Sequence, residues 1–189
     1  MTAPPPEEAL FVERLRRRDE RAFNELVRLY ERRVYGIVFR MMGRRDEAED
    51  VTQEVFVQVF KAIDQFRGDS KLSTWLVGIA TRRALDHARA RHRRGRWDKL
   101  KEWVGLGPSA EPAPDIRHES RTTAEKALDV LTLDQRTAFV LHEVEGHTLQ
   151  EISEMTGVGI STLHARLLAS RKRLDAYLVE AGLTRGGAK

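Results

Sequence analysis

Apolar residues recur three and four positions apart through most of the chain, and no stretch alternates apolar and polar residues as a half-buried strand does. In the first half, this spacing predicts helices at about 7–17, 20–42 and 47–63, and a further one from residue 73 to between 94 and 97. In the second half it predicts a helix resuming at residue 121 and others at about 133–143, 149–156 and 161–181. We therefore expect an all-α protein.

Polar residues that cap helices mark several of these boundaries. Asp46 is expected to be the N-cap of the helix at 47–63, with Glu49 completing a capping box, and Ser73 is expected to cap the helix that follows. Thr148 would cap the short helix at 149–156, and Gly157 lies in the tight turn that leads to the last helix. A short helix, a glycine turn and a longer helix follow the helix-turn-helix plan.

The prolines divide the chain. All six lie within residues 1–6 or 98–120, so neither helical block contains one. We expect a disordered tail at 1–6, a helical domain at 7–97, a flexible linker at 98–120, a small helix-turn-helix domain at 121–181 and a tail at 182–189.

Composition narrows the classes of function. The chain of 189 residues has no cysteine, which excludes disulfides and thiolate zinc sites, and it contains neither a membrane-length apolar run nor a signal-peptide pattern. We therefore expect a cytoplasmic protein without membrane insertion. His142, Glu143 and His147 resemble a zinc-protease signature, but the histidines are five residues apart and Gly146 interrupts the helix, so no metal, cofactor or catalytic residue is expected.

Charge is distributed unevenly around the second and third long helices of the first half. Asp46, Asp50 and Glu54 recur on one helix face, which is either a docking surface or a solvated face favoured by the helix dipole. Residues 82–97 hold seven arginines against one aspartate, and so dense a positive charge favours contact with nucleic acid. Between them lies the loop 64–71, in which Phe66 stands among polar neighbours.

At this point the residues resemble a known family. The segments that carry the resemblance are DEAEDVTQEVF and DQFRGDSKLSTWLVGIA, and later LTLDQRTAFVLHEVEGHTLQEISEMTGVGISTLHARLLASRKRL. They are similar to regions 2 and 4 of the extracytoplasmic-function (ECF) group of the sigma-70 family of RNA polymerase sigma factors. The resemblance implies a sigma factor whose partners are core RNA polymerase, through its beta-prime coiled coil and beta flap, promoter DNA, and an anti-sigma factor.

The resemblance also implies roles for individual residues. Those expected to bind polymerase are Asp46, Glu49, Asp50, Gln53, Glu54 and Gln58. Those expected at the melted minus-ten element are Phe66, Arg67, Gly68, Asp69, Ser70, Lys71, Trp75, Arg82, Arg83, Asp86 and Arg89, although the spacing of Trp75 favours a core position. Those expected at the minus-thirty-five element are Ser161, Thr162, His164, Ala165 and Leu168, with Arg166, Arg171, Lys172 and Arg173 for phosphates.

Three positions depart from the family pattern. Gly78 stands where many members carry a basic residue, Arg82 where asparagine is common, and His164 where lysine is usual. The promoter sequence therefore cannot be carried over from the family. Two other functions remain open: a stand-alone helix-turn-helix regulator of duplex DNA, and a degenerate sigma factor acting mainly as a protein-interaction module.

Overall fold

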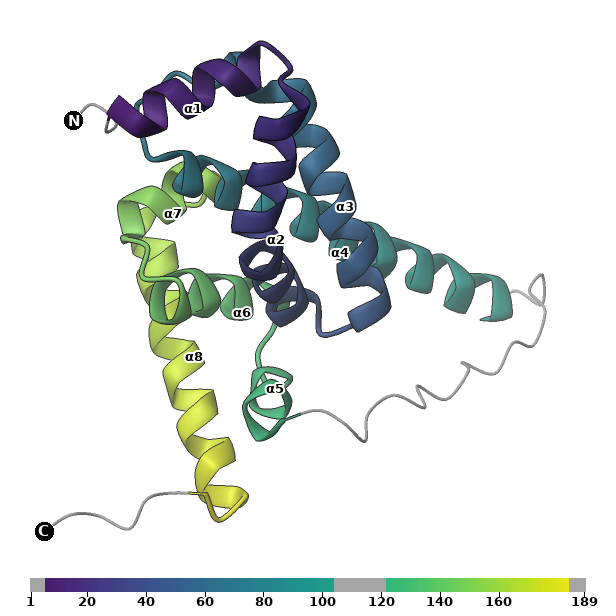
Figure 1. Ribbon diagram of the computed structural model, residues 1–189. Coiled ribbons are helices and arrows are strands. Elements are labelled where there is room, and N and C mark those ends of the chain that lie inside the picture. Colours follow the sequence, from purple (N-terminus) through teal and green to yellow (C-terminus); the bar gives the residue numbers. More distant parts are fainter. Residues whose placement is uncertain (1–5, 104–121, 184–189) are drawn as a thin grey trace, which may run out of the picture.

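The computed structural model describes residues 6–103 and 122–183, with side chains described for 6–95 and 122–183, and every regular element in these ranges is helical (Figure 1). The N-terminal domain consists of α1 (Pro6–Arg16), α2 (Glu20–Met42), α3 (Arg45–Ala62), the short 3-10 helix η1 (Ile63–Gln65) and α4 (Leu72–Trp103). The C-terminal domain consists of α5 (Thr123–Leu128), α6 (Leu133–Phe139), the π-helical turn η3 (Val140–Val144), α7 (Leu149–Thr156) and α8 (Ile160–Glu180). The prediction of an all-α fold is confirmed.

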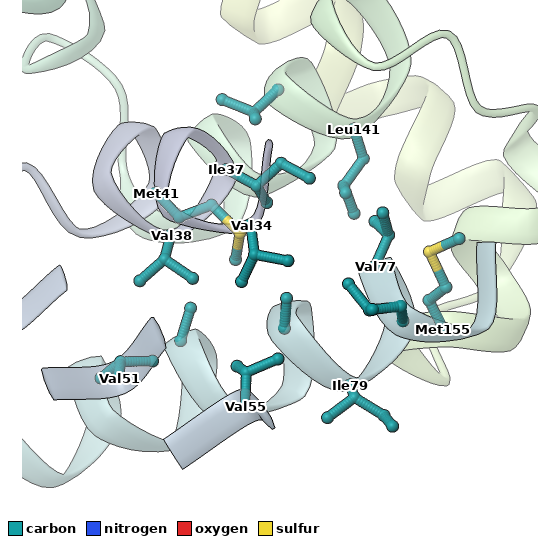
Figure 2. Close-up of a cluster of buried hydrophobic side chains, with 14 of the residues drawn as sticks. Val34, Ile37, Val38, Met41, Val51, Val55, Val77, Ile79, Leu141 and Met155 are labelled. Atoms are coloured by element: carbon teal, nitrogen blue, oxygen red, sulfur yellow. The ribbon is translucent and has the colours of Figure 1, made fainter. Parts of the chain in front are cut away.

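The core of the N-terminal domain lies where α2, α3 and α4 pack against one another. Val51, Val55 and Val59 recur every four residues along α3 and are completely buried, as their spacing predicted. Figure 2 shows Val51 and Val55 facing Val34 and Val38 of α2. The side of α3 opposite these valines is exposed, and it carries polar residues together with Val57, which is 53% exposed.

The ends of α2 follow the local sequence. Asp19 caps the helix by accepting hydrogen bonds from the backbone N–H groups of Arg21 (2.8 Å) and Ala22 (3.2 Å). At the other end, Gly43 adopts the left-handed conformation with φ of 75°, which a glycine reaches without steric cost. The predicted boundaries of this helix are confirmed.

Two predicted N-caps are wrong. Helix α3 begins at Arg45, one residue before Asp46, and its N-cap Arg44 makes no side-chain cap. Helix α4 begins at Leu72, so Ser73 lies inside it. The N–H of Leu72 instead donates to Glu8 Oε1 (3.0 Å), a carboxylate supplied by α1 from 64 residues upstream.

The C-terminal domain is held by local caps and by the packing of α8 on α6 and α7. Thr122, Thr132 and Thr148 each form a complete capping box with the residue three positions later. Gly157, with φ of 71°, ends α7 in the left-handed conformation and opens the turn into α8. The predicted helix-turn-helix is therefore present.

The two domains pack directly against each other. Helix α7 lies against α4, while α6 and η3 lie against α2. Figure 2 shows Leu141 and Met155 of the C-terminal domain beside Ile37 and Val77 of the N-terminal domain, in one buried cluster. Helix α4 continues to Trp103, so residues 98–103 of the predicted linker are helical, and its remainder lies outside the described residues.

Candidate functional site

The outer side of α3 carries a row of polar side chains, which we call the acidic face: Asp46, Glu49, Asp50, Gln53 and Glu54. All five are exposed. Arg44 donates to Asp46 (3.2 Å), and this bond holds the pKa of Asp46 below its usual value. Among the described residues, Asp50 and Glu54 have neither a hydrogen bond nor an ion pair of the side chain, so their charge remains available to a partner.

The neighbouring Glu47 has a different role. Its carboxylate pairs with Arg44 (3.1 Å) and with Arg91 of α4 (2.7 Å), and it is mostly buried between the two helices. Glu47 therefore ties α3 to α4 rather than joining the acidic face.

A cavity of about 380 Å³ opens between α3 and α4, and we call it the α3–α4 cavity. It gathers four residues predicted for the minus-ten element together with Gln58, which was predicted to bind polymerase. Arg83 Nη2 donates to Gln58 Oε1 (2.7 Å), so Gln58 lies in the cavity wall and not on the acidic face. The lining residues are Gln58, Ala62, Gln65, Trp75, Ile79, Arg82, Arg83 and Asp86.

Sequence reasoning missed three of these lining residues, namely Ala62, Gln65 and Ile79. Ile79 and Ala62 are nearly buried, and each has the helical spacing to its apolar neighbours that is typical of core residues. The spacing alone gives no signal that their edges also line a cavity.

The loop before α4 differs from its prediction at Phe66. This aromatic was expected to be exposed for contact with DNA, but it is only 3% exposed and its ring packs 5.3 Å from the ring of Trp75. Arg16 also donates to its carbonyl oxygen (2.5 Å), which fixes the loop on α1. The expectation that Phe66 is exposed is therefore wrong: its ring packs on Trp75 at the cavity wall, and its assignment to the minus-ten element stays a prediction.

The rest of the loop and the far part of α4 present polar and cationic groups. Arg67, Asp69, Ser70 and Lys71 are exposed, and Gly68 forms the bend with φ of 80°. On α4, Arg82, Asp86 and Arg89 are exposed and Arg83 is half-buried.

A second cavity, of about 470 Å³, separates the far part of α4 from α6. Cationic and apolar side chains line it, and none of its lining residues among those that the structure describes is a carboxylate. The lining residues are Met41, Met42, Ala88, Arg89, Arg91, His92, Arg93, Leu133 and Arg136.

The first turns of α8 expose the residues predicted for the minus-thirty-five element. Leu163 and Leu167 are buried at 2% and 4% exposure, whereas the other side of the helix faces out. The exposed set is Ser161, Thr162, His164, Ala165 and Leu168.

The four cations predicted to bind phosphates near this helix are not equivalent. Arg166 donates to Asp134 (2.5 Å), Arg171 to Glu143 (2.5 Å) and Arg173 to Gln135 (3.1 Å), all within the same domain. Lys172 is exposed, with no ion pair to any described residue. Lys172 is thus the cation that can meet a phosphate without giving up an internal partner.

The histidines near η3 are held in the C-terminal domain. His142 Nδ1 lies 2.8 Å from the carbonyl oxygen of His147, and His147 Nδ1 lies 3.6 Å from Glu151. Among the described residues, no cluster of three or more histidine, aspartate or glutamate side chains could hold a metal ion. Nor does any described helix combine the length and apolar character needed to cross a membrane.

Comparison with known proteins identifies both domains. The family model of sigma-70 region 2 matches residues 26–94, and that of sigma-70 region 4 matches residues 121–174. The RNA polymerase sigma-H factor of Pseudomonas aeruginosa is 34% identical over 176 residues, covering 88% of this chain and 91% of that protein. The ECF RNA polymerase sigma-E factor of Escherichia coli K12 is 30% identical over 175 residues, with coverage of 88% and 91%. The ECF RNA polymerase sigma factor SigE of Mycolicibacterium smegmatis is 36% identical over 162 residues, covering 84% of this chain and 62% of the longer relative.

Solved structures agree on the fold. The sigma factor RpoE in its complex with the anti-sigma factor NepR from Bartonella quintana aligns with a TM-score of 0.64 at 24% identity, covering 82% of this chain and 96% of the other. CnrH in its complex with the cytosolic domain of CnrY aligns with a TM-score of 0.64 at 21% identity, with coverage of 92% and 97%. The family models and the relatives together establish that this chain belongs to the ECF group of the sigma-70 family and is an RNA polymerase sigma factor.

Proposed function

We propose that this sigma factor docks on core RNA polymerase through the acidic face of α3 and holds melted promoter DNA in the neighbouring α3–α4 cavity. The observation that carries the proposal is that both surfaces belong to one helix. Asp50 and Glu54 project unpaired from its outer side, while Gln58 and Ala62 of its last turns line the cavity. Docking α3 on the polymerase therefore brings the cavity to the enzyme.

The acidic face suits a basic helical partner such as the beta-prime coiled coil. Complementary charges steer encounter and fix register more than they add affinity. Because Asp46 is already paired with Arg44, we assign the principal attraction to Asp50 and Glu54, with Glu49 and Gln53 at the edge of the contact.

The α3–α4 cavity suits the minus-ten element. An opened strand exposes unstacked bases, and proteins hold such bases with aromatic faces and polar groups while cations retain the backbone. Trp75 offers an aromatic edge, Arg82 and Arg83 offer donors and Asp86 an acceptor in the same wall. Arg67, Lys71 and Arg89 are exposed nearby and would contact phosphates.

The exposed start of α8 suits the duplex at the minus-thirty-five element. A recognition helix reads base edges in the major groove with its first turns, while flanking cations hold phosphates. Ser161, Thr162 and His164 would face the groove, and Lys172 would take a phosphate. Arg171 and Arg173 would have to break their hydrogen bonds to Glu143 and Gln135, respectively, before they could contact phosphates.

The proposal places the protein in the cytoplasm, where the chromosome is transcribed. It also predicts an anti-sigma factor as inhibitor, because two structures of the same fold were determined with such partners, NepR and CnrY. An inhibitor would act by covering the acidic face or the DNA-binding surfaces, where it would compete with polymerase or promoter.

Transcription from fragmented genomic DNA of the source organism tests the proposal. Core polymerase is assayed with and without the protein, and the start sites are mapped by sequencing the transcripts. We expect a discrete set of starts that requires both components. A stand-alone regulator would instead shift duplex DNA without polymerase, and a degenerate sigma factor would bind polymerase without producing new starts.

A further inference from the structure

We propose that the cavity of about 470 Å³ between α4 and α6, which we call the α4–α6 cavity, binds a free nucleotide that carries two or more phosphates. Its volume lies within the range of small-molecule sites in proteins, roughly 300–1,000 Å³. Of its lining residues, only Arg89 has a role in the proposed function. The cavity is therefore a further site, separate from the acidic face, the α3–α4 cavity and the start of α8.

The lining of the α4–α6 cavity contains more cations than the protein itself neutralises. Four arginines line it, and no carboxylate does so among the residues that the structure describes. Two of the four have partners just outside the lining: Arg91 pairs with Glu47 (2.7 Å) and Arg136 with Asp129 (3.2 Å). The positive charge of the other two is left for a ligand.

These two cations are Arg89 and Arg93. Both are exposed, and neither has a hydrogen bond or ion pair with any described residue. They lie four residues apart on α4, where like charges repel each other and disfavour the helix, so a bound anion would relieve the repulsion. His92, also exposed in this lining, adds an imidazole that can donate a further hydrogen bond.

Phosphate is the anion that these groups suit best. A guanidinium group is planar and binds phosphate oxygens through two parallel N–H donors. Two arginines without partners, with His92 beside them, match a ligand that has several negative charges and more than one phosphate. A single phosphate would leave part of this charge uncompensated.

Apolar residues in the same lining indicate that the ligand also has an apolar part. They are Met41 and Met42 from the end of α2, Ala88 of α4 and Leu133 of α6. The sulfur of methionine makes favourable contacts with aromatic rings, and two methionines lie here side by side in sequence. An inorganic anion would leave these residues without contact, whereas a nucleotide joins phosphates to an aromatic base.

Promoter DNA is the other polyanion to consider. A DNA strand that follows the arginines of α4 would not need Leu133 or the methionines of α2, because its affinity depends mainly on its phosphates. The combination of phosphate-binding and apolar groups in one small cavity therefore favours a free nucleotide over a strand.

Isothermal titration calorimetry of the full chain tests the site without polymerase or DNA. ATP, GTP and inorganic pyrophosphate are titrated separately, in the absence of magnesium, which would share the phosphate charge. We expect saturable binding of ATP or GTP with a Kd below about 1 mM, and binding of pyrophosphate at least about tenfold weaker because it lacks the base. Neither nucleotide binding at that concentration, or pyrophosphate binding equally tightly, would overturn the proposal.

A matched pair of variants separates the site from the general charge of α4. Arg93→Glu should raise the Kd of the nucleotide at least about tenfold, because it replaces an attraction by a repulsion. Arg94→Glu makes the same charge change at the next residue, which is exposed and does not line the cavity, so its Kd should stay within about twofold of the parent. An equal loss in both variants, or no loss in Arg93→Glu, would refute the assignment.

Thermal unfolding of the same samples provides the control for folding. A nucleotide that binds only the folded chain should raise the Tm of the parent and of Arg94→Glu, and should leave the Tm of Arg93→Glu unchanged. Circular dichroism verifies the helix content of each variant. If Arg93→Glu loses helix, the neutral variant Arg93→Gln replaces it, with the same direction of change expected.

Arg89 connects the cavity to the proposed function. An arginine bound to nucleotide phosphates cannot at the same time hold a phosphate of the minus-ten strand, so the two ligands should compete. We expect a saturating single-stranded minus-ten oligonucleotide to raise the Kd of the nucleotide, and an unchanged Kd would contradict the sharing of Arg89. This consequence rests on the proposed function, whereas the calorimetry without DNA does not, so the two can fail separately.

Discussion

Replacing Asp50 and Glu54 by arginine should abolish binding to core polymerase while leaving the protein folded. Both side chains are exposed and have no partner among the described residues, so each change should alter the free energy of unfolding by no more than about 0.5 kcal/mol. At the proposed interface, the double variant replaces two attractions by two repulsions. We expect a loss of roughly 3 kcal/mol or more of binding free energy, which is at least about a hundredfold in Kd.

Two measurements on the same samples separate binding from folding. Thermal unfolding followed by circular dichroism should give the same Tm for the parent and the double variant, while fluorescence anisotropy with labelled sigma factor should detect the loss of polymerase binding. Asp175→Arg combined with Glu180→Arg is the control, because it makes the same change in net charge on exposed positions of α8. Unimpaired binding of the α3 variant would refute the docking assignment. An equal loss in the control would assign the effect to overall charge instead.

Three further predictions follow from individual side chains. Phe66→Ala should destabilise the N-terminal domain by about 3 kcal/mol or more, because it empties a buried site against Trp75, whereas Arg67→Ala should leave the Tm unchanged in the same melts. Burial raises the pKa of Glu151, but hydrogen bonds from Thr148 and the nearby His147 outweigh it and the net pKa lies below the ordinary value of 4.5. The stability that Glu151 contributes is therefore complete above pH 4.5 and is lost as the pH falls through its folded pKa, so the difference in Tm between parent and Glu151→Gln should vanish in acid. Lys172→Ala should reduce the slope of log affinity against log salt for duplex minus-thirty-five DNA by about 1, and an unchanged slope would exclude a phosphate contact there.

Much of the fold could be predicted because its signals are local. Asp19, Gly43, Thr148 and Gly157 each act on backbone groups within four residues, so the sequence around them contains all the information that the boundary requires. The period of the buried valines in α3 likewise fixes which side of that helix is exposed.

What could not be predicted depends on residues distant in the chain. The residues around Ser73 suggest that it caps α4. Instead Glu8, from α1, accepts a hydrogen bond from the backbone N–H of Leu72 at the start of α4. Phe66 looks exposed in a polar loop, but Trp75 and α1 cover it. For the same reason the burial of Glu145 could not be predicted, because its ion-pair partner Arg33 lies in the other domain.

In the candidate site, too, features set by local sequence could be predicted and features set by distant residues could not. The exposure of Asp50 and Glu54 followed from helical spacing, whereas the α3–α4 cavity needs two helices to be placed together before it exists. Gln58 was assigned to the polymerase-binding residues only through the resemblance to the family. Gln58 lies one turn beyond Glu54 in α3, and its hydrogen bond with Arg83 shows that its side chain points toward α4.

Strand opening by the holoenzyme tests the central claim most directly. Once a start site has been mapped, 2-aminopurine placed in the minus-ten element of that promoter reports unstacking through its fluorescence. Core polymerase with the parent protein should raise the signal, and the variant Arg82→Ala with Arg83→Ala should bind polymerase normally yet leave the signal low. Full fluorescence with that variant, or opening by the protein without polymerase, would contradict the account.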